Sequence, residues 1–417
     1  MENRASHRVI SLVTVLLLCF LSWHSARAGY AALLTARVTS VNDLPAVSKA
    51  VRLSPADVHA HVLLGALLEV SDDRSAAIAQ YQTAVALRPD DYVVRMQLAR
   101  GQELAGDTTA AITNGRVAVS LAPFYAQPHW QLGNILVRAG QNEEGFQQLR
   151  LAGASDHTLW PPVIDLAWQV SRGDVAFVKR ELTPQTPAGY LALGDYLKKR
   201  KQIAEAVAMF SAAGDGAEAV QARRQYVNEL VNAKEFRTAF ELWRINPGVT
   251  SSYGIINPGF ETESDLNESF GWHAADLRET TLSLDNANPK QGRTSLRIDF
   301  NGAANAGADV ISQLVVVMPQ THYKLSLNFR ADGIVSGGLP NVAVVDAGDN
   351  KPLGQTGALP QTTNSWQLTT IEFTTGDSTS AIRIALQRLP CTTVPCPIFG
   401  KLWLDDFVLM GPDYGEG

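Results

Sequence analysis

Cysteine is scarce in this sequence. Its 417 residues hold three, and Cys19 lies within an apolar N-terminal run. Cys391 and Cys396 have no histidine or further cysteine near them in sequence, so a zinc site there is disfavoured. In an oxidising compartment this pair would close a small loop as a disulfide, and otherwise it would remain as two free thiols.

Clustered positive charge is also lacking. The formal net charge is −6, from 35 Lys and Arg against 41 Asp and Glu. Residues 1–249 contain 25 basic and 23 acidic residues, whereas residues 250–417 contain 10 and 18, so the second part carries −8. Nucleic-acid surfaces need gathered Lys and Arg to neutralise phosphates, so a nucleic-acid partner is disfavoured.

Recognisable catalytic motifs are missing. The chain has no Gly-x-Ser-x-Gly elbow, no His-Glu-x-x-His, no phosphate loop and no Gly-x-Gly-x-x-Gly after a strand. We therefore predict a non-catalytic protein. A cryptic glycan hydrolase remains an alternative, because a pair of carboxylates for glycoside hydrolysis has no sequence motif of its own.

The N-terminus has the features of an export signal. Arg4 and Arg8 precede an apolar run at residues 9–23, and small residues follow at Ala26 and Ala28. This pattern predicts a signal peptide cleaved after Ala28. The alternative is an uncleaved membrane anchor, although the run is shorter than the roughly 20 residues that a span requires. Both predict an exported protein, periplasmic, in the cell envelope or extracellular.

Proline recurs with a fixed period. Pro55, Pro89 and Pro123 lie 34 residues apart, and each follows an Ala/Val/Leu run: "SKAVRLSP", "QTAVALRP" and "RVAVSLAP". A period of this length is typical of stacked helical repeats.

One such unit, residues 58–91, resembles the tetratricopeptide (TPR) repeat. The matching positions are Leu64, Gly65, Leu68, Ala77, Tyr81, Ala84 and Pro89. Small residues at Gly65 and Ala77 let two helices approach closely, while Leu68 and Tyr81 fill the groove between them. Further copies, some degenerate, extend the resemblance over residues 29–245, which predicts an α-solenoid.

The TPR resemblance implies a protein or peptide partner, bound on the concave surface by the first helix of each pair. The candidate groove residues are Arg95, Gln102, Asn134 and Arg138. The alternative is that each of them is an ordinary solvent-exposed residue of a helix. His61 and His129 share one repeat position, two periods apart, so we predict that they pack between helices and bind no metal.

After residue 250 the pattern changes to short β-rich runs separated by Gly, Asn, Asp and Pro. Alternation such as Leu325, Leu327 and Phe329 is typical of half-buried strands. About eight runs predict a β-sandwich. Their order, from "INPGFE" through "PKQGRTSLRIDF" and "WQLTTIEFTT" to "GKLWLDDFVLM", resembles the galactose-binding-like jelly roll of carbohydrate-binding modules.

This second resemblance implies a structural calcium ion and glycan binding. The predicted calcium ligands are Glu261 and Asp405 or Asp406, and simple hydrogen bonding of these acids to turns is the alternative. The glycan-binding candidates are Trp272, His273, Tyr253 and Arg330. Trp366 and Trp403 lie within strand patterns and are predicted in the core, and "ADGIVSGGLPN" is predicted as a loop.

Together these features predict a multidomain protein, α then β. The predicted parts are a signal peptide or anchor (1–28), a TPR-like α-solenoid (29–245), a linker (246–255), a jelly-roll β-sandwich (256–412) and a tail (413–417). We expect an exported adaptor that binds protein through the solenoid and glycan through the sandwich, in exopolysaccharide or cell-surface assembly. The alternative is a structural scaffold that binds no sugar.

Overall fold

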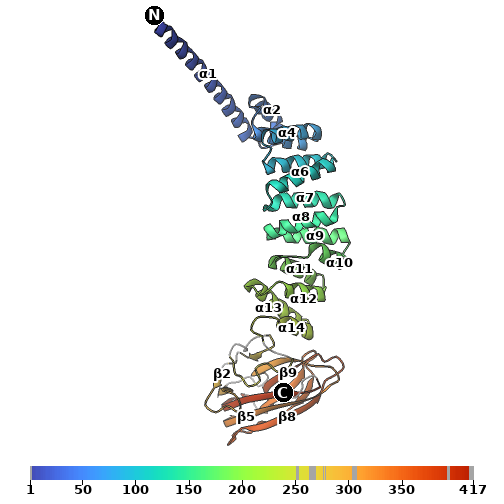
Figure 1. The fold of residues 1–417 in the computed structure, drawn as a ribbon. Coiled ribbons are helices and arrows are strands. Elements are labelled where there is room, and N and C mark those ends of the chain that lie inside the picture. The colour runs from blue at the N-terminus through green and yellow to red at the C-terminus, as the bar shows by residue number, and fades with distance from the viewer. Residues whose placement is uncertain are drawn as a thin grey trace. The chain divides into compact units, whose positions relative to one another are not determined.

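The computed structural model describes residues 2–249, 253–262, 269–275, 277, 279–302, 308–391 and 395–412, with side chains from residue 12 onward. Within these ranges fourteen α-helices precede ten β-strands (Figure 1). The chain divides into two compact units, residues 1–200 and residues 201–417. The last three helices belong to the second unit, although the predicted solenoid includes them. The predicted domain boundaries at 245 and 256 stay predictions.

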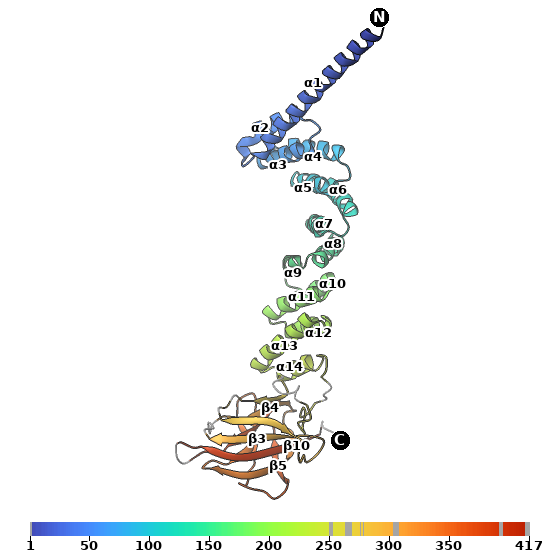
Figure 2. The same ribbon diagram turned by 90° about the vertical axis from the view of Figure 1, so that its left-hand side faces the viewer.

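The first unit is built from helix pairs. Its helices are α1 (Glu2–Ala36), α2 (Leu44–Leu53), α3 (Val58–Val70), α4 (Arg74–Leu87), α5 (Tyr92–Leu104), α6 (Thr108–Leu121), α7 (Ala126–Arg138), α8 (Asn142–Ser155), α9 (Trp160–Ser171), α10 (Val175–Leu182) and α11 (Pro187–Lys199). Helices α3, α5 and α7 begin 34 residues apart, and so do α4, α6 and α8. The predicted helical repeat is confirmed over these three pairs, which follow one another in Figure 2.

Local sequence sets the ends of these helices. Asp57 and Asp91 cap α3 and α5 by accepting backbone N–H bonds, and Asp73 and Asp107 cap α4 and α6 in the same way. A capping carboxylate satisfies N–H groups that have no partner within the helix and favours the positive end of its dipole. Each periodic proline lies two residues after a helix end, as predicted.

Close packing within a pair depends on a missing side chain. A Cβ atom on Gly65 would lie 2.6 Å from Cε1 of Tyr81, which is fully buried. Tyr81 also fits against Gly101 of the following helix α5, where a Cβ would lie 3.1 Å from its ring. The predicted roles of Gly65 and Tyr81 are therefore confirmed, because the ring occupies the space that glycine leaves.

Helix α1 contains the apolar N-terminal run. Its segment Leu12–Ala36 is long and apolar enough to cross a membrane, and its most apolar part is not buried in the protein. A signal sequence meets the same criterion.

The second unit begins with three helices, α12 (Ile203–Ala212), α13 (Ala217–Asn232) and α14 (Phe236–Trp243). Ten strands follow: β1 (Trp272–Ala274), β2 (Thr280–Asp285), β3 (Ser295–Gly302), β4 (Ile311–Val316), β5 (His322–Ser336), β6 (Pro340–Asp346), β7 (Pro352–Gln355), β8 (Gln367–Thr374), β9 (Ala381–Arg388) and β10 (Ile398–Met410). They form two antiparallel sheets, ordered β1-β4-β9-β6-β7 and β2-β3-β10-β5-β8.

The two sheets share one core, to which Ile311 and Ile384 contribute from one sheet and Leu327 and Leu402 from the other. The two antiparallel sheets are therefore confirmed, and the jelly-roll topology stays a prediction. The predicted loop at "ADGIVSGGLPN" is wrong in its first part. Strand β5 continues to Ser336 because β10 pairs with it along this stretch.

Aromatic residues join α14 to the segments that precede the first strand of this unit. Phe240 stacks on Tyr253, with ring centroids 5.0 Å apart, and meets Phe270 edge to face at 5.1 Å. Trp243 also contacts Phe270. The last helix thus covers apolar surface at one end of the sandwich.

Candidate peptide-binding groove

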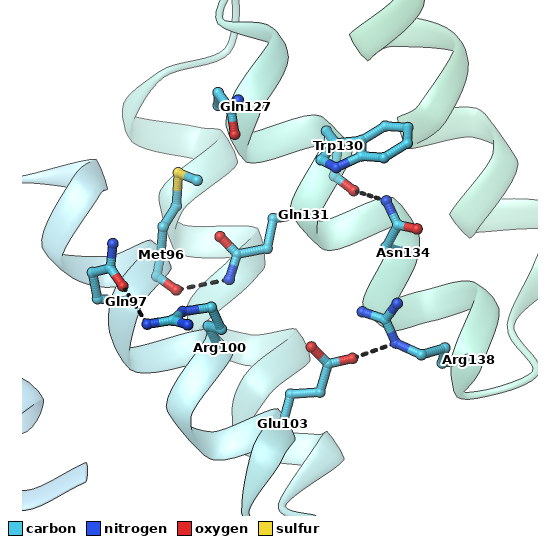
Figure 3. Close-up of a pocket in the computed structure, with 9 residues that line it drawn as sticks. All are labelled: Met96, Gln97, Arg100, Glu103, Gln127, Trp130, Gln131, Asn134 and Arg138. Carbon is cyan, nitrogen blue, oxygen red and sulfur yellow. Dashed lines mark hydrogen bonds and ion pairs between the residues drawn. The ribbon is translucent and has the colours of Figure 1, made fainter. Parts of the chain in front are cut away.

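A groove of about 510 Å³ lies between α5 and α7, the first helices of two successive pairs (Figure 3). Its lining residues are Met96, Gln97, Arg100, Glu103, Gln127, Trp130, Gln131, Asn134 and Arg138. Two of the four predicted groove residues, Asn134 and Arg138, are among them. Sequence reasoning missed the other seven.

The groove combines carboxamides with two apolar side chains. Gln131 donates to the backbone carbonyl of Met96 at 2.7 Å, and Asn134 donates to that of Trp130 at 2.8 Å (Figure 3). Met96, Trp130, Gln131 and Asn134 are each half-buried. A carboxamide has both donors and acceptors, so these side chains keep further bonding capacity toward a polypeptide backbone.

Charges on the first helices are paired between successive repeats. Arg138 Nε lies 2.6 Å from Glu103 Oε1, and Arg100 Nη2 lies 2.9 Å from Glu69 Oε2. The Tyr81 hydroxyl donates to the same Glu69 oxygen at 2.7 Å, and burial together with this bond raises the pKa of Tyr81. The two arginines are about half exposed, but each already has an acidic partner.

Arg95 and Gln102 occupy a different environment and do not line this groove. Arg95 Nε donates to the Pro89 carbonyl at 3.3 Å, and its Nη1 donates to Asn114 Oδ1 at 3.1 Å. Gln102 is buried and accepts from Asn114 Nδ2 at 2.9 Å. Both side chains therefore bind α5 to α6, and Arg95 also binds the preceding turn, which corrects their prediction as groove residues.

The same arrangement occurs at the two histidines. His61 contacts the Pro55 carbonyl at 3.0 Å and Gln80 Oε1 at 2.8 Å. His129 contacts the Pro123 carbonyl at 2.9 Å and Gln148 Oε1 at 2.6 Å. Both histidines are buried, so their predicted packing role is confirmed. We call His61, Arg95 and His129, which lie 34 residues apart, the turn clamps.

One signal in the sequence connects five of the seven missed groove residues. Met96 and Trp130 lie 34 residues apart, and so do Gln97 and Gln131. Projecting Asn134 back by one period gives Arg100, another lining residue. Equivalent repeat positions share one face of the stack, because each pair repeats the geometry of the one before it.

The four glycan-binding candidates do not form one site. Trp272 is 1% exposed, packs between Phe260 and Phe407, and donates to the Asn257 carbonyl. Its prediction as a sugar-stacking residue is wrong, because neither ring face reaches solvent. His273 is exposed on β1, and Tyr253 lies on Phe240 beside α14.

Arg330 lies on the opposite sheet, against tryptophan. Its guanidinium is 4.1 Å from the ring centroid of Trp403 and 5.7 Å from that of Trp366. Trp403 is 7% exposed and donates to Asp285 Oδ2 at 2.7 Å, whereas Trp366 is half-buried. The Ala287 backbone N–H and this indole N–H hold the pKa of the Asp285 carboxyl below its ordinary value.

The predicted calcium ligands have other hydrogen-bond partners. Glu261 accepts the backbone N–H of Arg293, and fully buried Asp405 accepts that of Lys290. The Asp406 carboxylate accepts a hydrogen bond from the Asn328 side chain. Burial raises the pKa of the Asp405 carboxyl.

Glu261 and Asp405 nonetheless converge. A Cβ on Gly259 would lie 3.3 Å from Asp405 Oδ1 and 3.7 Å from Glu261 Oε1. Across the described ranges no three His, Cys, Asp or Glu side chains gather as a metal site. Glu261 and Asp405 thus lie near the same glycine, and calcium binding stays a prediction.

No protein-family model matches this chain, and no curated protein matches it. Among solved structures, the crystal structure of MamA is 17% identical, covers 38% of this chain and 90% of its own, and has a TM-score of 0.31. The MamA 41-end structure from Desulfovibrio magneticus RS-1 is 16% identical, with coverages of 39% and 92% and a TM-score of 0.33. These TM-scores are too low to support an argument about fold or function.

Proposed function

We propose that this protein is a non-catalytic scaffold that binds an extended polypeptide segment in the groove between α5 and α7. The observation that carries the proposal is the lining itself, in which four carboxamides surround two apolar side chains on equivalent faces of successive repeats. Carboxamides bond to backbone N–H and C=O groups, and an apolar side chain of the partner contacts Met96 and Trp130.

The paired charges define the kind of segment. Arg138 is neutralised by Glu103 within the groove, and Arg100 by Glu69. A strongly acidic or basic partner would have to break these pairs, whereas an uncharged segment leaves them intact. We therefore expect an uncharged, extended segment, bound with little dependence on salt.

The adaptor role extends to the second unit as a further part of the proposal. Arg330 beside half-buried Trp366 supports contact with a polysaccharide on that sheet, because cationic and aromatic groups contact hydroxyls and sugar faces. The convergence of Glu261 and Asp405 supports a bound calcium ion. Export to the periplasm, cell envelope or extracellular space, with or without an N-terminal anchor, is supported by the apolar segment Leu12–Ala36.

A peptide array probed with the full chain tests the central proposal. We expect bound peptides to be uncharged with at least one large apolar residue, and the Trp130→Ala variant to lose them by about tenfold or more, as for a buried aromatic contact. The matched control is Phe124→Ala, an aromatic residue that is 87% exposed and lies outside the groove lining. Equal binding by wild type and Trp130→Ala would contradict the proposal.

A further inference from the structure

A buried arginine lies against the disulfide that joins Cys391 to Cys396. Arg388, the last residue of β9, is 4% exposed. Its Nη2 is 3.1 Å from Cys396 Sγ and 3.8 Å from Cys391 Sγ. The guanidinium is therefore within hydrogen-bonding distance of both sulfurs and closer to Cys396.

Several bonds hold this guanidinium in position. Nη2 also donates to Ser336 Oγ and to the Cys396 carbonyl, both at 2.8 Å, and Nε donates to the Gly338 carbonyl at 3.2 Å. Ser336 ends β5, so the arginine connects strands of the two sheets. A Cβ on Gly338 would lie 2.7 Å from Cys391 Sγ, so only glycine leaves room for that sulfur.

The position of the cation gives the two sulfurs different chemistry. A positive charge beside a sulfur favours the thiolate over the thiol, and the effect is stronger where water is excluded. A disulfide exchanges faster when the departing sulfur is stabilised as a thiolate, and it is then more easily reduced. Cys396 is the better leaving group here, because Arg388 lies nearer to it.

We propose that Cys391 and Cys396 form a thiol–disulfide exchange site in which Arg388 stabilises the Cys396 thiolate. The reaction partner is a dithiol. One of its thiolates attacks Cys391 Sγ, the bond between Cys391 and Cys396 breaks, and the electron pair leaves on Cys396 beside Arg388.

The second sulfur of the dithiol then completes the reaction. As a thiolate it attacks the sulfur of the reagent bound to Cys391, so that the reagent becomes a disulfide and Cys391 departs as a thiolate. The reagent loses two electrons and the protein gains two. The reagent releases two protons. Cys391 takes up one of them, and the other either binds Cys396 or stays in solvent while Cys396 remains a thiolate.

Alkylation of single cysteines tests the asymmetry. With Cys19→Ser as background, Cys391→Ser leaves Cys396 as the one thiol, and Cys396→Ser leaves Cys391. Iodoacetamide rates are measured on the full chain from pH 5 to pH 10. We expect Cys396 to react at least about fivefold faster at pH 7 and to lose its rate at lower pH than Cys391, as a cation-stabilised thiolate does. Thiols with the same pH profile would overturn the proposal.

The dithiol equilibrium tests the role of the arginine. In the Cys19→Ser background, reduced fractions are measured against dithiothreitol. Arg388→Gln should require a reduced-to-oxidised ratio of the reagent about tenfold higher, because the Cys396 thiolate then lacks the adjacent cation. Arg383→Gln, on the same strand but directed at Asn350 and Asp309, should change nothing.

Milder variants decide the question if Arg388→Gln does not fold. Ser336→Ala keeps the cation but removes one of its anchors, and Arg388→Lys keeps the charge but loses the fork of donors. A smaller difference between the two thiols in either variant supports the proposal. Equal alkylation rates for Cys391 and Cys396 with Arg388 in place, which need no arginine variant, identify the disulfide as purely structural.

Discussion

The turn clamps show how one side-chain position stabilises successive repeats. His61, Arg95 and His129 each reach back six residues to a proline carbonyl and forward nineteen residues to an amide side chain. Two unlike side chains make the same two contacts, because each presents two ring or guanidinium nitrogens at suitable separation. This repeat position therefore requires two nitrogen atoms at this separation, and either histidine or arginine supplies them.

Removing a clamp should destabilise the first unit. The His129→Ala substitution removes a buried ring and leaves the partly buried Pro123 carbonyl and Gln148 side chain without this partner. We expect the free energy of unfolding to fall by about 1–3 kcal/mol, the cost of unsatisfied buried polar groups. Urea denaturation followed by circular dichroism measures it. His157→Ala, at an exposed position, is the control and should change stability by less than about 0.5 kcal/mol.

Asp285 should make the second unit sensitive to acid. Its folded pKa lies below the ordinary value, so its bonds stabilise the protein fully above the ordinary carboxyl pKa of about 4 and are lost as pH falls through the folded pKa. Asp285→Asn should cost about 1 kcal/mol at pH 7 and progressively less below about pH 4. The free energy of unfolding of each variant is measured at a series of pH values, with Asp332→Asn at an exposed position as the control. The same pH dependence in both variants would refute the prediction.

Helix pairs pack through matched small and large residues. Tyr81 fits against Gly65 on one side and Gly101 on the other, and its hydroxyl donates to Glu69. Gly133 has the same role in the third pair, where a Cβ would lie 2.7 Å from Leu149 Cγ. Glycine at these positions thus sets how closely neighbouring helices approach.

Filling this space should disrupt the pair. Gly65→Ala places a methyl group 2.6 Å from the Tyr81 ring, which its hydroxyl bond and its burial keep in place. We expect a loss of about 1–3 kcal/mol in the free energy of unfolding, as for other overpacked cores.

Gly216→Ala is the matched control for this change. Nothing lies within 4 Å of its added methyl group, and its φ of −63° suits any residue. Because Gly216 is the N-cap of α13, where glycine is preferred over alanine, the free energy of unfolding should fall by less than about 1 kcal/mol. If Gly65→Ala unfolded no more easily than Gly216→Ala in urea, close packing at this position would not be limiting.

Helices and sheets combine in the second unit. Phe270 precedes the first strand but packs against Phe240 and Trp243 of α14, and Ser269 bonds to Asn228 of α13. A sandwich without these helices would expose aromatic surface to water, which costs about 1.5–3 kcal/mol for each large side chain.

Fragments of the chain should show this dependence. We expect residues 201–417 to melt at least about 5 °C above residues 253–417, because the longer fragment keeps the aromatic contacts of α14. Calorimetry measures both transitions. Phe240→Ala in the longer fragment should give an intermediate melting temperature, and equal melting of the two fragments would show that these contacts contribute nothing.

The local features of this protein follow from patterns of neighbouring residues. The 34-residue period and its prolines predict the helix pairs, and alternation predicts eight of the ten strands. These features depend on interactions between residues close in the chain, so their pattern can be read directly. Strands β1 and β7, of three and four residues, are too short to show alternation.

Which polar side chains share a site depends on the packing of segments that are distant in the chain. Arg95 and Arg138 both read as exposed helix residues, yet one clamps a turn and the other lines the groove. Asp285 meets Trp403 from 118 residues away, and Arg388 meets Cys396 where strands of both sheets end. Such contacts depend on how distant segments pack, and many packings are compatible with the same local pattern of polar and apolar residues.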